Sequence, residues 1–230
     1  MTMNIHAFIC TRSTNHSPTT HSLLSYLDRI GAVTHLLVNK ASIFSAYAEE
    51  LKTITDKNDI VIMMHDDIEI LSDPETFKEE LEQALFDSRC GFVGVAGATK
   101  LTQDAVWWNR EVWQNQGLRG TVFHGKHRSV MTSTLYGPPG KVVVMDGLFL
   151  AAKARTLEDI GLEKPKTFTG DWDFYDIYYT LSAYEKGYYN KVLPIVLRHE
   201  SVGNLAGRDS WHENRKKLLG LFRLPIECHS

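Results

Sequence analysis

One α/β domain with an open, mostly parallel β-sheet flanked by helices is the fold that the sequence predicts. Short apolar runs typical of strands alternate with helix-period segments through the first half of the chain, as they do in βαβ units. Residues 59–64 include a continuous apolar run of the kind found in strands covered on both faces. No linker, internal repeat or low-complexity tract interrupts the 230 residues, a length that suits one sizeable domain.

The elements of the first half are predicted from their apolar spacing and their start signals. A helix is expected to begin at Ser17-Pro18 and another at Asp73-Pro74, because each pair places a capping oxygen before a proline at the first helical position. A third, short helix is expected over residues 43–51. Strands are expected over residues 5–10, 33–38, 59–64 and 91–96.

The second half has a less regular pattern. Residues 117–128 carry glycine, histidine and basic side chains, and they are predicted to form a mobile loop. Order is expected to return with strands over residues 141–145, 148–152 and 192–197. Helices are expected over residues 154–160, 173–186 and 210–221.

The composition indicates a globular protein and excludes several function classes. A formal net charge of −3 with 23% charged residues gives no reason to expect a nucleic-acid partner. No apolar run approaches the roughly 20 residues of a transmembrane segment, and the N-terminus lacks the layout of a secretory signal, so a cytoplasmic location is expected. The three cysteines, an odd number without short spacings, predict neither a disulfide framework nor a zinc site.

The triplet His65-Asp66-Asp67 follows directly on the predicted buried strand. An open α/β sheet places its ligand crevice at the carboxyl ends of its strands. Hard divalent cations prefer carboxylate oxygens, and Mg²⁺ takes one or two protein carboxylates and completes its shell with substrate phosphates. The triplet is therefore a candidate metal site, although acidic residues after a strand also begin ordinary turns.

A second acidic cluster lies at the start of the helix predicted over residues 173–186. Asp171 or Asp173 is expected to cap this helix. Asp176 lies one turn further on, where a carboxylate could take a proton from an acceptor hydroxyl if the helix end faces the crevice.

Two further candidates follow predicted strands. Asp146-Gly147 permits a tight turn with close backbone approach, and an ordinary hairpin turn is the alternative. His199 is a candidate ligand of Mn²⁺ or partner of phosphate, and a structural histidine is the alternative.

With these residues in place, the chain resembles the family-2-like glycosyltransferases of the GT-A fold (nucleotide-diphospho-sugar transferases), in particular the small branch whose metal motif reads His-x-Asp. The resemblance covers most of the chain. It rests on the order of the segments Phe8-Ile9-Cys10-Thr11-Arg12, Ile60-Val61-Ile62-Met63-Met64-His65-Asp66-Asp67, Gly94-Val95-Ala96-Gly97, Val144-Met145-Asp146-Gly147, Phe174-Tyr175-Asp176-Ile177, Leu197-Arg198-His199-Glu200-Ser201-Val202-Gly203 and Trp211-His212-Glu213-Asn214-Arg215.

The resemblance implies a single glycosyltransferase domain over residues 1–230, with a nucleotide-binding half of about residues 1–100 and an acceptor half of about residues 101–230. Its cofactor would be Mn²⁺ or Mg²⁺. Its partners would be a nucleotide sugar, with uridine as the family preference, and a glycan or small-molecule hydroxyl acceptor.

The resemblance also implies a role for each candidate residue. Asp67, with His65 and His199, matches the metal site, and Asp176 matches the general base of inverting members. The residues matching the donor site are Thr11, Arg12 and Asn39 for the base and ribose, Asp66 for the ribose and diphosphate, and Asp146 and Gly147 for the sugar and acceptor.

Departures from the family pattern keep two other functions open. Tyr178 stands where relatives carry a second acidic residue, which favours a non-catalytic module that binds nucleotide sugar or glycan. A sugar nucleotidyltransferase is less favoured, because Cys10-Thr11-Arg12-Ser13-Thr14-Asn15 contains no glycine to approach a phosphate.

Two segments are assigned to the substrates within this hypothesis. The Trp107-Trp108 region is expected to offer apolar faces to a sugar, with packing in the core as the alternative. Residues 117–128 are expected to close over the donor as a lid.

Overall fold

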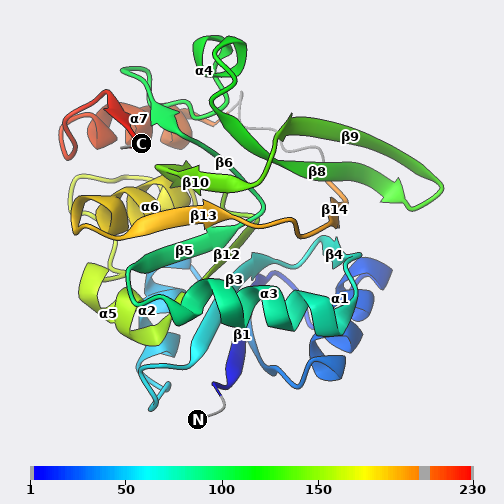
Figure 1. Cartoon of the computed structure of the whole chain (residues 1–230). Helices are drawn as coiled ribbons and strands as arrows, with labels where there is room; N and C mark the ends of the chain where they lie inside the picture. The colour runs from blue at the N-terminus through cyan, green and yellow to red at the C-terminus, as the bar shows by residue number, and fades with distance from the viewer. Residues whose placement is uncertain (1–2, 202–207, 229–230) are drawn as a thin grey trace.

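A seven-stranded mixed sheet forms the centre of the computed structural model, which describes residues 3–201 and 208–228 (Figure 1). The strand order is β10-β13-β5-β12-β3-β1-β2. The strands are β1 (Ile5–Thr11), β2 (Val33–Val38), β3 (Ile60–His65), β5 (Cys90–Gly94), β10 (Gly140–Val142), β12 (Phe149–Lys153) and β13 (Tyr189–Val192).

The parallel part of this sheet determines where the candidate residues lie. Strand β1 pairs in parallel with β2 and with β3, in a register that places Cys10 opposite His65. The carboxyl ends of the three strands therefore meet at one edge, as predicted. Strand β12 runs antiparallel to β3 and β5, while β13 is parallel to β5. The predicted α/β class is confirmed, but the sheet is not mostly parallel, because β12 pairs antiparallel with both of its neighbours and β10 pairs antiparallel with β13.

Most helices lie where their sequence signals place them. The side chains of Ser17 and Asp73 accept hydrogen bonds from the backbone N–H groups of Thr20 and Thr76, each at 3.1 Å, so both predicted caps are confirmed. The helices are α1 (Pro18–Arg29), α2 (Ile43–Leu51), α3 (Pro74–Phe86), α4 (Arg110–Gln114), α5 (Ala154–Ile160), α6 (Tyr175–Glu185) and α7 (Asp209–Leu218). None of the described helices is long and apolar enough to span a bilayer.

A second sheet lies beside the carboxyl edge and closes over part of it. Its strand order is β11-β6-β8-β14-β4, and β9 pairs with β8. Its strands are β4 (Ile68–Ile70), β6 (Ala96–Ala98), β8 (Leu118–His127), β9 (Val130–Gly137), β11 (Val144–Met145) and β14 (Leu197–His199). A short ribbon of β7 (Lys100–Leu101) and β15 (Ile226–Glu227) completes the described strands.

The prediction of a mobile loop over residues 117–128 is wrong. Ten of these residues form β8, which pairs with β9 in a long hairpin that extends from the body of the molecule (Figure 1). Leu118, Gly120 and Val122 are buried and alternate with partly exposed residues, the period of a half-buried strand. The expectation that this segment closes over the donor as a lid stays a prediction.

Two predicted strands are each divided between the two sheets, residues 91–96 between β5 and β6 and residues 141–145 between β10 and β11. The strand predicted over residues 192–197 is wrong: Val192 ends β13, Leu197 begins β14, and the four residues between them are in no strand. In the last case Pro194 lies at the break, where it has no N–H group to donate to a ladder.

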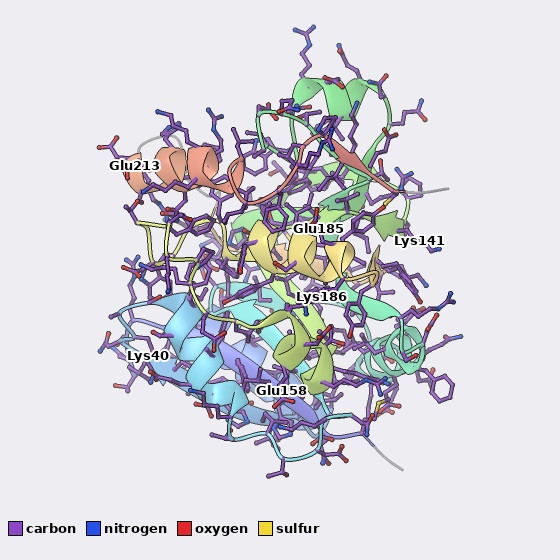
Figure 2. The ribbon with its side chains drawn as sticks, turned by 90° about the vertical axis from the view of Figure 1, so that its left-hand side faces the viewer. Lys40, Lys141, Glu158, Glu185, Lys186 and Glu213 are labelled. Atoms are coloured by element: carbon purple, nitrogen blue, oxygen red, sulfur yellow. The ribbon has the colours of Figure 1, made fainter. Side chains whose placement is uncertain are left out.

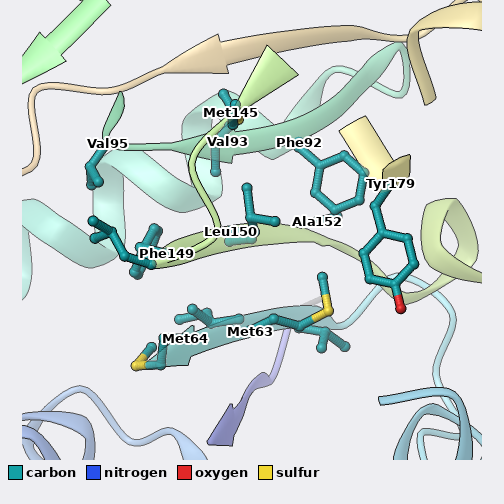
Figure 3. Packing of buried hydrophobic residues seen from close by; sticks show 14 of the residues in the cluster. Met63, Met64, Phe92, Val93, Val95, Met145, Phe149, Leu150, Ala152 and Tyr179 are labelled. Atoms are coloured by element: carbon teal, nitrogen blue, oxygen red, sulfur yellow. The ribbon is translucent and has the colours of Figure 1, made fainter. Parts of the chain in front are cut away.

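The core beneath the site is continuous and apolar. Met63 and Met64 of β3 are fully buried below β12 in Figure 3, and Met63 lies on the side of Tyr179 of α6. This packing holds the end of β3, and with it His65, in a defined place. Charged side chains of both signs lie on the outside of the molecule, among them Lys40, Lys141, Glu158, Glu185, Lys186 and Glu213 (Figure 2).

Candidate functional site

A cleft of about 1380 Å³ opens at the carboxyl ends of β1 and β3, between the two sheets and the start of α6. Residues from both halves of the chain meet in it. The predicted residues that line the cleft are Thr11, Arg12, His65, Asp66, Asp67, Asp146, Gly147, Asp176 and His199.

Asn39 is the one predicted site residue that does not line the cleft. Its backbone has a left-handed conformation, with φ at 50°, and its N–H donates to the carbonyl of Thr11 at 2.9 Å. The turn after β2 therefore places Asn39 beside the predicted nucleotide region, while Ala41 from the same turn reaches the cleft.

Three predicted ligands converge at the end of β3. Nε2 of His199 lies 3.2 Å from Oδ1 of Asp67, and Nδ1 of His65 lies 3.8 Å from the same oxygen. One ligand atom from each residue falls within 4.8 Å of the other two. This is a spacing at which one carboxylate and two imidazoles can share a divalent ion.

The hydrogen bonds of Tyr175 orient His65 for metal binding. The Tyr175 hydroxyl donates to the carbonyl of Gly147 at 2.8 Å, so its oxygen is left to accept from Nε2 of His65 at 3.2 Å. Nδ1 of a neutral His65 then carries the lone pair, on the side of Asp67. Burial lowers the pKa of His65, although the charge of Asp67 opposes this, and the neutral ring is the form that binds a metal.

Asp67 and His199 form a charged pair in the protein without metal. Burial raises the pKa of Asp67, but the hydrogen bond and charge of His199 outweigh it and hold that pKa below its ordinary value. Burial lowers the pKa of His199, but the hydrogen bond and charge of Asp67 outweigh burial, so the pKa of His199 lies above its ordinary value. Ser201 Oγ also lies 3.1 Å from Nε2 of His199. A metal ion at this site would replace the proton on His199.

Asp176 lies in the first turn of α6 and faces the same cleft. Its Oδ2 accepts a hydrogen bond from the N–H of Gly147 at 3.0 Å, and its Oδ1 accepts from the N–H of Ile177 at 2.9 Å. Burial, followed by the charge of Asp146, raises its pKa to about 7. A carboxylate with this pKa is suited to accept a proton near neutral pH.

The expected caps of α6 are wrong. Phe174 holds the cap position in a left-handed conformation, with φ at 66°, and its side chain makes no capping hydrogen bond. Asp173 is buried and instead accepts from Ser210 at 2.6 Å and from Arg208 at 3.1 Å. Both aspartates are thus used by tertiary contacts, since Asp171 accepts from Lys164 at 2.8 Å.

Gly147 allows the close approach that its position predicted. Strands β11 and β12, on either side of it, belong to different sheets, so the hairpin alternative is excluded. A Cβ atom on Gly147 would lie 2.6 Å from Cζ of Tyr175 and 2.9 Å from Cβ of Asp176. Asp146 stabilises the turn by accepting from the N–H of Leu148 at 3.0 Å.

Several residues that line the cleft were not predicted, among them His124, Tyr175, Ser201, Arg208 and Trp211. His124 lies opposite His199 in the pairing of β8 with β14, with their ring centroids 6.0 Å apart. Leu118, Gly120 and Val122 alternate with the polar Arg119 and Thr121 in the sequence, and this alternation was the available signal for the strand. Val202 and Gly203, which belong to the family segment that contains His199, lie outside the described residues.

The fold and this cleft define a class of protein, the GT-A glycosyltransferases. The chain matches the family described as Glycosyltransferase like family over residues 24–219, and it belongs to that family. No curated protein matches the chain.

Solved structures share the fold at low sequence identity. GalNAc-T7, solved with UDP, GalNAc and Mn²⁺, is 8% identical with a TM-score of 0.57, covering 96% of this chain and 49% of that one. The catalytic domain of Drosophila β1,4-galactosyltransferase 7, solved with xylobiose, is 12% identical with a TM-score of 0.50, covering 90% and 74%. The inositol-1-phosphate CTP transferase of T. maritima is also similar, with 10% identity, a TM-score of 0.41 and coverage of 94% and 96%. The chain thus spans about half the length of the GalNAc-T7 chain.

Proposed function

We propose that this protein transfers a sugar from a nucleotide diphosphate sugar, UDP-linked, to a hydroxyl acceptor, with inversion and with the help of Mn²⁺ or Mg²⁺. The observation that carries this proposal is the convergence of His65, Asp67 and His199 in the cleft that also holds Asp176. Family membership supports the transferase class.

The donor set of the cleft fits a divalent ion. Asp67 offers a carboxylate, and the hydrogen bond from His65 to Tyr175 leaves the His65 lone pair on the Asp67 side. When bound, Mn²⁺ or Mg²⁺ offsets the negative charge that builds on the departing nucleotide diphosphate. The presence of Mn²⁺ and UDP in the GalNAc-T7 structure supports this choice of ion and nucleotide. Asp66 and the Thr11–Arg12 turn would bind the nucleotide.

The base would be Asp176. Its carboxylate would take the proton of the acceptor hydroxyl as the acceptor oxygen bonds to the anomeric carbon and the bond to the diphosphate oxygen breaks. The N–H groups of Gly147 and Ile177 hold this carboxylate in one orientation. A single displacement of this kind inverts the anomeric centre.

The position of Tyr178 weakens the case for a non-catalytic module. Tyr178 does not line the cleft but packs against Phe168 and Phe222, with ring centroids 6.0 Å apart in both pairs. A carboxylate at this position would therefore meet an apolar cluster in this chain. Asp176 remains the acidic residue of this helix turn that faces the cleft.

A thermal-shift panel tests the proposal. Nucleoside diphosphates and nucleotide sugars are each added with and without Mn²⁺, because a ligand that binds the native state raises the unfolding midpoint by mass action. We expect a uridine diphosphate or its sugar to raise the midpoint only when Mn²⁺ is present. No metal-dependent shift with any member of the panel would contradict the donor site.

A further inference from the structure

An aromatic wall lines the cleft on the side of the acceptor half, and it consists of Trp107, Trp108, Phe174 and Trp211. Trp108 is 37% exposed, so part of its indole is open to a ligand. Trp107 lies behind it and is only 2% exposed, with the ring centroids 5.5 Å apart in an edge-to-face contact. The prediction that both tryptophans offer faces to a sugar is therefore narrowed to Trp108.

The wall is held in place by contacts between elements far apart in sequence. The ring of Trp108 lies 6.2 Å from that of Trp211 in α7, and Trp211 lies 5.1 Å from Phe174. Arg215 lies over Trp211 at 5.5 Å. The wall thus needs little ordering when a ligand binds, which favours affinity.

The wall ends at the proposed base. Phe174 immediately precedes α6 and adopts its left-handed conformation two residues before Asp176. Left-handed non-glycine residues are strained, and such strain is retained where the surroundings determine it. Trp108, Trp211 and Asp176 line the same cleft, so a ligand against the wall shares the cleft with the proposed base.

A polar atom in the wall also lacks a partner. The indole nitrogen of Trp107 is buried and makes no hydrogen bond among the described residues. A buried N–H group without an acceptor is unfavourable, and most such groups in native proteins are satisfied. An oxygen atom that came within hydrogen-bond distance of this N–H group would satisfy it.

One pair of opposite charges lies beside the wall, since Asp173 accepts from Arg208 and from Ser210. The guanidinium of Arg215 lies over the Trp211 ring. A large apolar surface with a few polar groups suits an uncharged ligand. A pyranose ring has this character, because one face presents C–H groups and its rim presents hydroxyls.

We propose that the aromatic wall is an acceptor subsite that stacks on a pyranose ring, so that the acceptor is an uncharged saccharide. This inference rests on the proposed function for the identity of the base and of the donor side. A hydroxyl of a peptide is the competing acceptor, and the experiment is arranged to distinguish the two.

Saturation-transfer NMR of the full chain with Mn²⁺ and UDP tests this subsite. The probes are methyl glycosides of common pyranoses at millimolar concentration and, separately, a serine- and threonine-containing peptide. We expect magnetic saturation to pass from the protein to the pyranose C–H protons and not to the protons of the peptide. Trp108→Ala should weaken this binding about tenfold, the amount expected for loss of one aromatic contact.

Trp113→Ala is the matched control. Trp113 is 47% exposed in α4 and packs on Tyr136, but it does not line the cleft. This variant should bind the glycosides as the unaltered chain does. Binding of the peptide instead of pyranoses, no transfer to any pyranose, or equal binding by Trp108→Ala and the unaltered chain would overturn the subsite.

The thermal shift with UDP and Mn²⁺ separates the two proposals. A normal shift in Trp108→Ala with weaker glycoside binding supports both proposals. A normal shift without any glycoside binding overturns the subsite and leaves the donor site standing. Glycoside binding at the wall without a nucleotide shift overturns the proposed transfer alone.

Discussion

Nε2 of His199 lies 3.2 Å from Oδ1 of Asp67, although the two residues are 132 positions apart in the sequence. The pKa of Asp67 lies below its ordinary value and that of His199 lies above its own. A carboxyl group whose pKa is lowered by folding stabilises the protein above its unfolded pKa, about 3.9 for aspartate. A histidine whose pKa is raised by folding stabilises the protein below its unfolded pKa, about 6.5. In metal-free protein the pair should stabilise most between about pH 4 and about pH 6.5.

The pair can be isolated by comparing unfolding midpoints of the unaltered chain and Asp67→Asn over a range of pH. The unfolding midpoints of the two proteins should differ most between about pH 4 and about pH 6.5. This difference should decrease as the pH falls toward the folded pKa of Asp67, and it should also decrease as the pH rises through the folded pKa of His199. A difference that is constant from pH 4 to pH 9 would contradict the pairing. Mn²⁺ should also stabilise less at low pH, because it competes with the proton on His199.

Replacing Asp176 by Asn should remove transfer while leaving metal-dependent nucleotide binding intact. General-base catalysis contributes about 10²–10⁴-fold, so a loss of this size in the transfer rate is expected. In the unaltered enzyme the rate should rise with pH through about 7, because the ionised carboxylate is the active form. Measured transfer in Asp176→Asn that equals the unaltered rate would remove the base assignment.

The raised pKa of Asp176 should change stability with pH in the opposite direction to the lowered pKa of Asp67. Its raised pKa means that the folded chain keeps a proton that the unfolded chain releases, so stability falls as pH rises from about 4 to about 7. In Asp176→Asn, this contribution to the loss of stability with rising pH should be absent. Chemical denaturation at pH 5 and pH 8 measures it, and an equal pH dependence in both proteins would count against the buried carboxylate.

Gly147→Ala should disturb the proposed base and, through Tyr175, the orientation of His65. Its Cβ would lie 2.9 Å from that of Asp176, and it would also displace the Tyr175 ring. Overpacking of this kind destabilises by about 1–3 kcal/mol. We expect slower transfer and a lower unfolding midpoint. Gly220→Ala is the control, since its Cβ would lie 3.4 Å from the carbonyl oxygen of Lys217, an ordinary contact.

The hairpin of β8 and β9 depends on an ion pair beneath it. Glu69 is 6% exposed and accepts from Arg198, 4% exposed, at 2.9 Å and from Arg128 at 2.6 Å. Glu69→Ala leaves Arg198 buried without its carboxylate and should destabilise by about 3–5 kcal/mol. Arg128→Ala removes only the exposed partner and should change stability by about 0–1 kcal/mol. Equal urea midpoints for the two variants would contradict this difference.

Local patterns were sufficient for the parallel half of the fold and for the residues at strand ends. The apolar run of β3 predicted where His65 and Asp67 lie, because a buried strand and its end are read from adjacent residues. Ser17 and Asp73 predicted two helix starts for the same reason.

Long-range pairing determined what local patterns could not predict. His124 meets His199 only because β8 pairs with β14, and Phe174 takes the cap of α6 because Asp173 is held by α7. Asn39 was assigned by its place after β2, but the conformation of a turn decides which of its residues faces a cleft. The roles of the site residues stay predictions until they are tested.

The most direct measurement is a calorimetric titration of UDP into the unaltered chain and into Asp67→Asn, each with and without Mn²⁺. Asp159→Asn is the matched control, because Asp159 pairs with Lys186 and does not line the cleft. We expect binding that requires Mn²⁺ in the unaltered chain and in the control, and affinity at least about 100-fold weaker in Asp67→Asn. Mn²⁺-independent binding of UDP, or equal affinity in Asp67→Asn, would contradict the metal site.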